Sequence, residues 1–227
     1  LWLPNGEVRA VLQITHGMTE YMGRYEAFAE YLTKDGWLVF GHDHLGHGNS
    51  APSEDDLGFI ASKGGKDYMV SDILNLARQM QKQYPNVPTV LFGHSMGSFL
   101  ARLYAEKYSD SIDAVIIHGT SGPNPALPFG KVLIKLIKFF KGERARSKFV
   151  RSLAEGGYNN AFDKSEGEGA WLTRDGKMVA GRPSDPRTNF VFTVSGYADL
   201  FEMLGAINTR KWFESFPKNL PALVISG

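Results

Sequence analysis

The sequence predicts an α/β fold in which a mostly parallel sheet carries helices on both faces and a helical cap is inserted late in the chain. Two observations lead to this prediction: strand and amphipathic helix patterns alternate over residues 1–122, and an irregular block over 123–206 interrupts them. Such alternation is typical of parallel sheets, because each connection between parallel strands carries a helix across the sheet. We therefore predict a core over 1–122, a cap or lid over 123–206, and a return to the core over 207–227.

Short apolar and β-branched runs predict five strands, at residues 8–15, 37–41, 87–92, 112–117 and 221–226. The first helix is expected at 23–34. The helical pattern is clearest over 65–84, where apolar residues recur at i, i+4, i+7, i+8 and i+11, namely Met69, Ile73, Leu76, Ala77 and Met80. A further helix is expected after Ser95, with Phe99, Leu100, Leu103, Tyr104 and Tyr108 at helical spacing.

The composition narrows the class of protein. The 227 residues carry a net charge of +1 and contain no cysteine, which excludes a disulfide framework, a thiol nucleophile and a thiolate metal site. The absence of cysteine also fits a reducing cytosol, and the near-neutral charge gives no sign of a nucleic-acid partner. No run of 18 apolar residues predicts a transmembrane helix. We expect a cytoplasmic protein without a cofactor; the sequence indicates no oligomeric state.

The motif "GHSMG" places Ser95 between Gly93 and Gly97. Chance alone would produce on the order of 0.2 such Gly-x-Ser-x-Gly matches in a chain of this composition, so the context of the motif decides its meaning. A predicted strand leads into the motif and a predicted helix leads out of it, which is the context of a nucleophile elbow. In such an elbow the sharp turn exposes the serine Oγ, and the glycines allow the two backbones to approach closely. We therefore predict that Ser95 is a catalytic nucleophile.

Acyl transfer through a serine also needs donors for the oxyanion. Behind an elbow of this kind, one donor is the backbone N–H of the residue after the nucleophile, here Met96. The second comes from the loop after an early strand, and the segment "ITHGMTEYMGRY" supplies that loop. Gly17 permits a tight turn there, and the N–H of Met18 is the predicted second donor.

Three ordered segments, "THGMTEYMGRY", "GHDHLGHGNS" and "GHSMGS", make the chain resemble α/β-hydrolases of the monoacylglycerol lipase and bacterial lysophospholipase group. The later segments "AWLTRD", "DPRTNFVFTVSGYADLF" and "FPKNLPALVISG" resemble the cap and penultimate strand of the bacterial members. The resemblance covers nearly the whole chain. It implies an α/β-hydrolase fold, Ser95 as nucleophile, Met18 and Met96 as oxyanion donors, and loops shaped by His16, Gly17, His94 and Gly97.

The resemblance implies a serine hydrolase that cleaves a lipid-like ester, such as a monoacylglycerol or a lysophospholipid, through an acyl-enzyme. Two alternatives stay open. Relatives on this fold include thioesterases and peptidases, and a hydrolase-like protein can also be a non-catalytic binding protein.

In the resembling enzymes the nucleophile is followed by an aspartate and then a histidine. All six histidines of this chain precede that place, so the resemblance implies a triad Asp and His beyond residue 227. The chain also begins without methionine, and we expect parts of the fold at both ends to lie outside the sequence. Within the chain, His118 follows a strand next to the elbow strand and could approach Ser95. A pocket-lining or structural role is the preferred interpretation for His118, because no acid follows at a place that would orient it.

Two other clusters have alternative interpretations. His42, Asp43, His44 and His47 could suggest a metal site, but Gly46 and Gly48 mark a loop, and in the resembling family this segment supports the oxyanion loop through hydrogen bonds. We expect no metal. Glu20 and Arg24, four residues apart, are expected to form a local ion pair worth a few tenths of a kcal/mol.

The segment 131–141 of the predicted cap is basic and amphipathic. Lys131, Lys135 and Lys138 form one stripe, and the remaining surface is covered by Leu133, Ile134, Leu136, Ile137 and Phe140. One interpretation is a surface that contacts lipid interfaces or lines an acyl pocket, which would give peripheral membrane contact. The other, which we prefer, is a cap helix packed on the core with a solvated basic face. The two are compatible.

Overall fold

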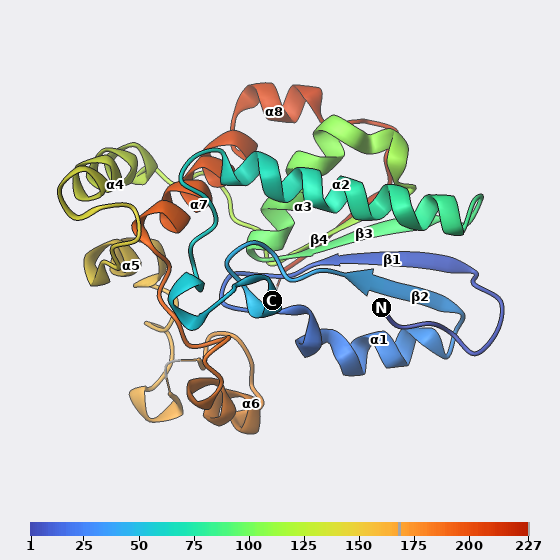
Figure 1. Cartoon of the computed structure of the whole chain (residues 1–227), viewed down its shortest axis with the longest axis horizontal. Coiled ribbons are helices and arrows are strands. Elements are labelled where there is room, and N and C mark those ends of the chain that lie inside the picture. The colour runs from blue at the N-terminus through green and yellow to red at the C-terminus, as the bar shows by residue number, and fades with distance from the viewer. Residues whose placement is uncertain (168, 227) are drawn as a thin grey trace.

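The computed structural model describes residues 1–167 and 169–226. Its centre is a five-stranded sheet in the order β2-β1-β3-β4-β5, in which neighbouring strands pair in parallel (Figure 1). The strands are β1 (Ala10–Thr15), β2 (Trp37–Gly41), β3 (Thr89–His94), β4 (Ala114–His118) and β5 (Ala222–Ile225). The prediction of a mostly parallel sheet is confirmed, with each strand within about two residues of its expected bounds. Trp2 adds one antiparallel bridge to Val39 at the edge of β2.

The helices are α1 (Glu26–Thr33), α2 (Gly65–Gln83), α3 (Met96–Tyr108), α4 (Leu127–Lys141), α5 (Lys148–Glu155), α6 (Gly176–Gly181), α7 (Val194–Ile207) and α8 (Arg210–Ser215). The first predicted helix differs in its opening turn, which is a 3-10 helix over Met22–Tyr25. The N–H of Met22 donates to the Asp43 carboxylate at 2.7 Å, so this turn is held from a neighbouring loop.

The helices form layers on both faces of the sheet, as Figure 1 shows. On one face Leu12 and Ile14 pack with Ala29 of α1. Alternate residues point to the other face, where Val11 packs with Leu76 of α2. Here α2, α3 and α7 pack together and enclose the largest apolar cluster. The period of two along β1 therefore sends successive side chains into two separate cores.

The helices α4, α5 and α6 lie beyond the end of the sheet at which the strands finish (Figure 1). We call these three helices the cap helices. Helix α7 packs on α4 and α5 but also on α2 and α3, so it joins the cap helices to the core. The boundaries of the cap at residues 122 and 206 therefore remain predictions from the sequence.

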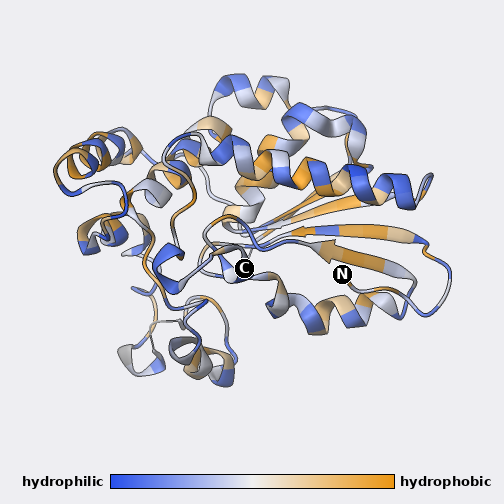
Figure 2. Cartoon of the chain, in the orientation of Figure 1, coloured by the Kyte–Doolittle hydropathy of each residue, from blue (hydrophilic) through white to orange (hydrophobic). Residues whose placement is uncertain are grey.

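Helix α4 carries apolar side chains on two sides, and Figure 2 shows its hydrophobic residues at the margin of the molecule. Ile134 is buried against the core, whereas the side chains of Phe139 and Phe140 are 80% and 77% exposed. Phe129, Val132 and Leu136 are also exposed. Core packing and an exposed apolar face therefore coexist on one helix. Within residues 1–167 and 169–226, no helix is both long and apolar enough to span a membrane.

Candidate active site

The order of the strands places a crevice at the carboxyl ends of β1 and β3. The chain leaves β1 to form β2 on one side, and β3 pairs with β1 on the other. At such a switch point the loops after the two strands turn toward opposite faces of the sheet, and ligands bind between them. The loop over 16–20 follows β1, and Ser95 follows β3.

Ser95 lies in the sharp turn between β3 and α3, with φ 51° and ψ −119°. A residue other than glycine in such a conformation costs about 1–3 kcal/mol, so its surroundings must hold it. The Ser95 N–H donates to the carbonyl of His118 at 2.9 Å, which ties the turn to β4. A Cβ on Gly93 would overlap the carbonyl of Gly97, and one on Gly97 would overlap that of Thr15. The two glycines are thus required by the close approach of β1, β3 and α3.

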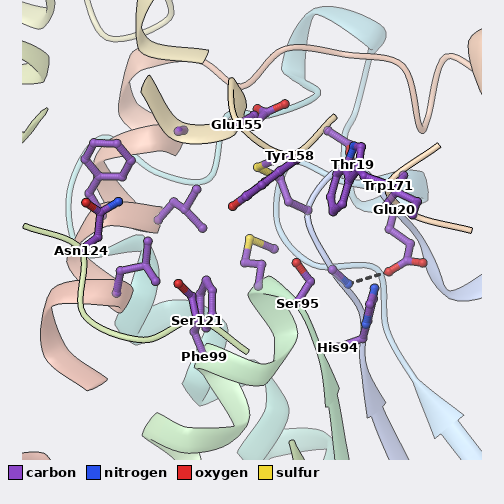
Figure 3. A pocket seen from close by; sticks show the side chains of 18 of the residues that line it. Thr19, Glu20, His94, Ser95, Phe99, Ser121, Asn124, Glu155, Tyr158 and Trp171 are labelled. Atoms are coloured by element: carbon purple, nitrogen blue, oxygen red, sulfur yellow. Dashed lines mark hydrogen bonds between the residues drawn. The ribbon is translucent and has the colours of Figure 1, made fainter. Parts of the chain in front are cut away.

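The Ser95 side chain faces a cavity of about 200 Å³ between the sheet edge and the cap helices (Figure 3). Apolar side chains from α3, α5 and α7 form one wall, namely Phe99, Leu153, Leu200, Phe201 and Leu204. Polar and aromatic groups line other parts of the cavity, among them Thr19, Ser121, Asn124, Tyr158 and Trp171. The cavity could therefore hold a ligand that has both an apolar chain and a polar end.

Both predicted oxyanion donors border this cavity together with Ser95. Met96 is the first residue of α3, so its N–H has no acceptor within the helix. Among the described residues, neither the N–H of Met96 nor that of Met18 donates a hydrogen bond. Gly17 brings the two loops together, since a Cβ there would lie 3.3 Å from the Cβ of Ser95.

His16 fixes the loop after β1 from beneath. Its ring is buried, and its Nε2 accepts the N–H of His44 at 2.9 Å. The neutral ring therefore carries its proton on Nδ1, which donates to the carbonyl of Gly17 at 2.8 Å. Burial holds the pKa of His16 well below its usual range, and nearby His47 lowers it further. His16 is thus a neutral link between the two loops.

The segment 42–49 supports the same loop. Asp43 accepts the N–H groups of Met22 and Asn49 at 2.7 and 2.8 Å, and the ring of His47 packs edge-on against Phe192. Burial lowers the pKa of His47 to about 4. Among residues 1–167 and 169–226, no three His, Cys, Asp or Glu side chains are placed to hold one metal ion.

Glu20 has a contact that the sequence interpretation missed. The predicted ion pair with Arg24 is present, with Nε and Oε1 3.6 Å apart. The other carboxylate oxygen, Oε2, accepts the N–H of Gly17 at 2.7 Å and the hydroxyl of Tyr25 at 3.0 Å. The spacing of Glu three residues after Gly17 resembles the reach of a capping box and could have indicated this contact.

His94 and His118 form a pair beside Ser95. The register of β3 and β4 aligns them, and their Nδ1 atoms are 2.8 Å apart, so one ring donates and the other accepts. His94 borders the cavity, and burial lowers its pKa. In this arrangement Nδ1 of His118 is engaged by His94 rather than by Ser95. The structure thus gathers Met18, Ser95, Met96 and His94 around one cavity. His16 is hydrogen-bonded to Gly17, and His118 to His94 and Ser95.

The chain is similar to known hydrolases in family, sequence and structure. The model of the family described as serine aminopeptidase, S33 (Hydrolase_4) matches residues 6–227. Monoglyceride lipase of Rattus norvegicus is 33% identical over 141 residues, which are 61% of this chain and 45% of the rat protein. Monoglyceride lipase of Homo sapiens is 41% identical over 106 residues, or 46% of this chain and 32% of the human protein. The matches thus span half or less of these relatives.

A carboxyl esterase from Bacillus coagulans, solved in complex with glycerol, is similar in structure with a TM-score of 0.88 and 27% identity. The match covers 97% of this chain and 71% of the esterase chain. The α/β-hydrolase fold expected from the resemblance is thereby confirmed for the part of the chain that the structure describes.

Proposed function

The chain belongs to the serine aminopeptidase S33 family of α/β-hydrolases, and we propose that it cleaves a lipid-like carboxylic ester through an acyl-enzyme on Ser95. The observation that carries this proposal is the strained Ser95 at the border of a cavity that Met18 and Met96 also border, where neither of their backbone N–H groups donates a hydrogen bond within the described part of the chain. The similarity to monoglyceride lipases and a carboxyl esterase supports an ester as substrate. A monoacylglycerol or a lysophospholipid has the required polar end and apolar chain.

In the proposed reaction, Ser95 Oγ attacks the ester carbonyl, and the N–H groups of Met18 and Met96 stabilise the oxyanion. The bond to the alcohol then breaks, the alcohol leaves with a proton, and water hydrolyses the acyl-enzyme. One oxyanion donor is worth roughly 2.7–4 kcal/mol of transition-state stabilisation. The reaction also needs a general base that accepts the proton of Ser95 Oγ and later returns it to the leaving alcohol.

The lining of the cavity suits an ester substrate better than the amino end of a peptide. An α-amino group is a cation, and carboxylates are strong acceptors for it. Glu20 is engaged by Gly17 and Tyr25, and Glu155 is bonded to the hydroxyl of Tyr197 at 2.5 Å. The acidic side chains that border the cavity therefore already have partners, whereas its apolar wall is open to an acyl chain.

The test is ester hydrolysis by the protein and by Ser95→Ala, with esters, thioesters and aminoacyl amides as substrates. We expect esters to be preferred and Ser95→Ala to lose activity by roughly 10⁴- to 10⁶-fold. Ser121→Ala is a matched control, because Ser121 borders the same cavity. Undiminished hydrolysis by Ser95→Ala would contradict the proposal. A preference for thioesters or amides would mean that the substrate is not an ester.

We also propose that α4 makes peripheral contact with a lipid surface that carries anionic headgroups. Its exposed Phe139 and Phe140 lie on a helix that also carries Lys131, Lys135 and Lys141. An apolar face flanked by lysines suits an interface in which acyl chains meet negative charge. Such contact would bring the cavity close to membrane-derived esters.

A further inference from the structure

We propose that Glu20 is a positioning residue of the oxyanion hole, which holds the loop after β1 so that the Met18 N–H faces Ser95. This inference rests on the proposed function, because it assigns Glu20 a part in that same reaction. It gives the Glu20 carboxylate a second role beside its ion pair with Arg24.

The geometry starts from the two peptide groups that flank Gly17. The N–H of Gly17 donates to Glu20 Oε2 at 2.7 Å, drawn as the dashed line in Figure 3, and its carbonyl accepts the Nδ1–H of His16 at 2.8 Å. Both peptide planes around Gly17 are therefore held by side chains. Glycine has an unusually wide choice of backbone conformations, so these two hydrogen bonds supply a constraint that the residue itself lacks.

The second of these planes contains the proposed donor. The Gly17 carbonyl and the Met18 N–H belong to one planar trans peptide, in which the two groups point in opposite directions. Because the carbonyl is directed to the buried His16 ring, the Met18 N–H points away from that ring. Met18 and Ser95 border the same cavity, and the Met18 N–H has no partner in the described chain. The first plane, which Glu20 holds, meets the second at the Gly17 Cα, so fixing the first narrows the positions that the second can take.

The charge of Glu20 is compensated, as a site for a developing oxyanion requires. A bare carboxylate beside that site would repel the negative charge of the transition state. Here Oε2 accepts two hydrogen bonds, from Gly17 and Tyr25, and Oε1 faces the Arg24 guanidinium at 3.6 Å. The hydrogen bonds and the ion pair thus use different oxygens, which allows them to be separated by mutation.

Glu20→Gln separates the two roles. A glutamine side chain keeps one oxygen, which can accept from Gly17 and Tyr25, while its amide group takes the place of Oε1 and ends the ion pair. Glu20→Ala removes both interactions. Glu30→Ala, an exposed position on α1, is the matched control for loss of one acidic side chain.

The experiment is steady-state ester hydrolysis by these three variants and the unchanged protein, with the melting temperature of each measured in parallel. We expect Glu20→Ala to lower kcat by about 10- to 100-fold while KM changes by less than about threefold, because only the transition state carries the oxyanion. Glu20→Gln should retain kcat within about threefold, and Glu30→Ala should match the unchanged protein.

The outcomes distinguish the inference from the proposed function. If the unchanged protein hydrolyses no ester, the proposed function fails. If it does and Glu20→Ala keeps its kcat, the positioning role alone is wrong. Equal losses of kcat in Glu20→Gln and Glu20→Ala would assign the effect to the ion pair with Arg24 and overturn the inference. Should Glu20→Ala not fold, Glu20→Met takes its place: a loss of kcat of about 10- to 100-fold that Glu20→Gln does not share supports the role, and an unchanged kcat contradicts it.

Discussion

The loops around Ser95 and the cap helices border the same cavity but are built differently. Around Ser95, glycines touch neighbouring backbone, and buried side chains such as His16 hold the peptide groups. In α6 and on the outer face of α4 the opposite holds: a Cβ on Gly176 or Gly181 would meet nothing within 4 Å, and Phe139 is mostly exposed. The residues proposed for catalysis are therefore held rigidly, whereas α6 and the outer face of α4 have free space around them.

The contrast has a physical basis. Oxyanion donors act only when they are fixed before the reaction, because a donor that must reorient loses much of its benefit. A cover over an apolar cavity has to admit a chain and release it, and such elements are drawn from the less tightly packed parts of a protein. Mutations and pH changes should therefore affect the two regions very differently.

The largest difference is expected from glycine to alanine substitutions in the two regions. Gly97→Ala places a Cβ against the Thr15 carbonyl, so we expect a loss of roughly 3 kcal/mol or more of unfolding free energy. Gly176→Ala, at the start of α6, should be neutral or stabilising by roughly 0.4–1 kcal/mol. Urea unfolding of both variants measures this. Equal unfolding free energies of the two variants would mean that the difference in packing does not affect stability.

Acid should lower the unfolding free energy through the buried histidines near the loops. Burial lowers the pKa of His47 to about 4, so between pH 6.5 and 4 the unfolded chain binds a proton that the folded chain does not. Unfolding free energy should then fall by about 3 kcal/mol from His47 alone as the pH drops through this range. His16 and His44, whose pKa values burial also lowers, act in the same direction.

The variant His47→Phe isolates this contribution, because a phenyl ring can keep the contacts with Phe190 and Phe192. It loses the hydrogen bond from Nδ1 to the Leu45 carbonyl, so it should be less stable at pH 7. Its stability should nevertheless decline less steeply between pH 6.5 and 4, as chemical denaturation at several pH values would measure. A decline as steep as that of the unchanged protein would contradict the assignment to His47.

The smallest effect on stability is expected on the outer face of α4. Replacing Phe139 and Phe140 by serine should change unfolding free energy by less than about 0.5 kcal/mol per site, because both side chains are exposed. The same double variant should bind vesicles with anionic headgroups more weakly in a sedimentation assay. Phe213→Ser on α8, which is also exposed, is the control. Unchanged vesicle binding by the double variant would contradict the proposed contact between α4 and lipid.

The sequence predicted the parts of the site that depend on local chain geometry. The elbow at Ser95 and the loop at Gly17 each follow a strand, so a strand pattern and a glycine were enough to place them. Contacts between segments were not predicted. The His94–His118 pair depends on the register of two strands, and the cavity wall at Leu200 depends on how α7 crosses the core. Such pairings leave no periodic signal in either segment alone.

Glu20 shows a different limit. Its spacing from Arg24 is a familiar helix pattern, and the pair exists, yet the shorter contact runs backward to the N–H of Gly17. Side chains that bind backbone groups are hard to predict, because every residue except proline offers the same donor.

The most direct test of the central claim is labelling of the protein with a fluorophosphonate, followed by mass spectrometry of its peptides. An activated serine displaces fluoride from phosphorus and keeps the phosphonyl group, so we expect one modified residue, Ser95, and no labelling of Ser95→Ala. Absence of an adduct on Ser95 in the folded protein would contradict the proposed nucleophile and point to a hydrolase-like binding protein.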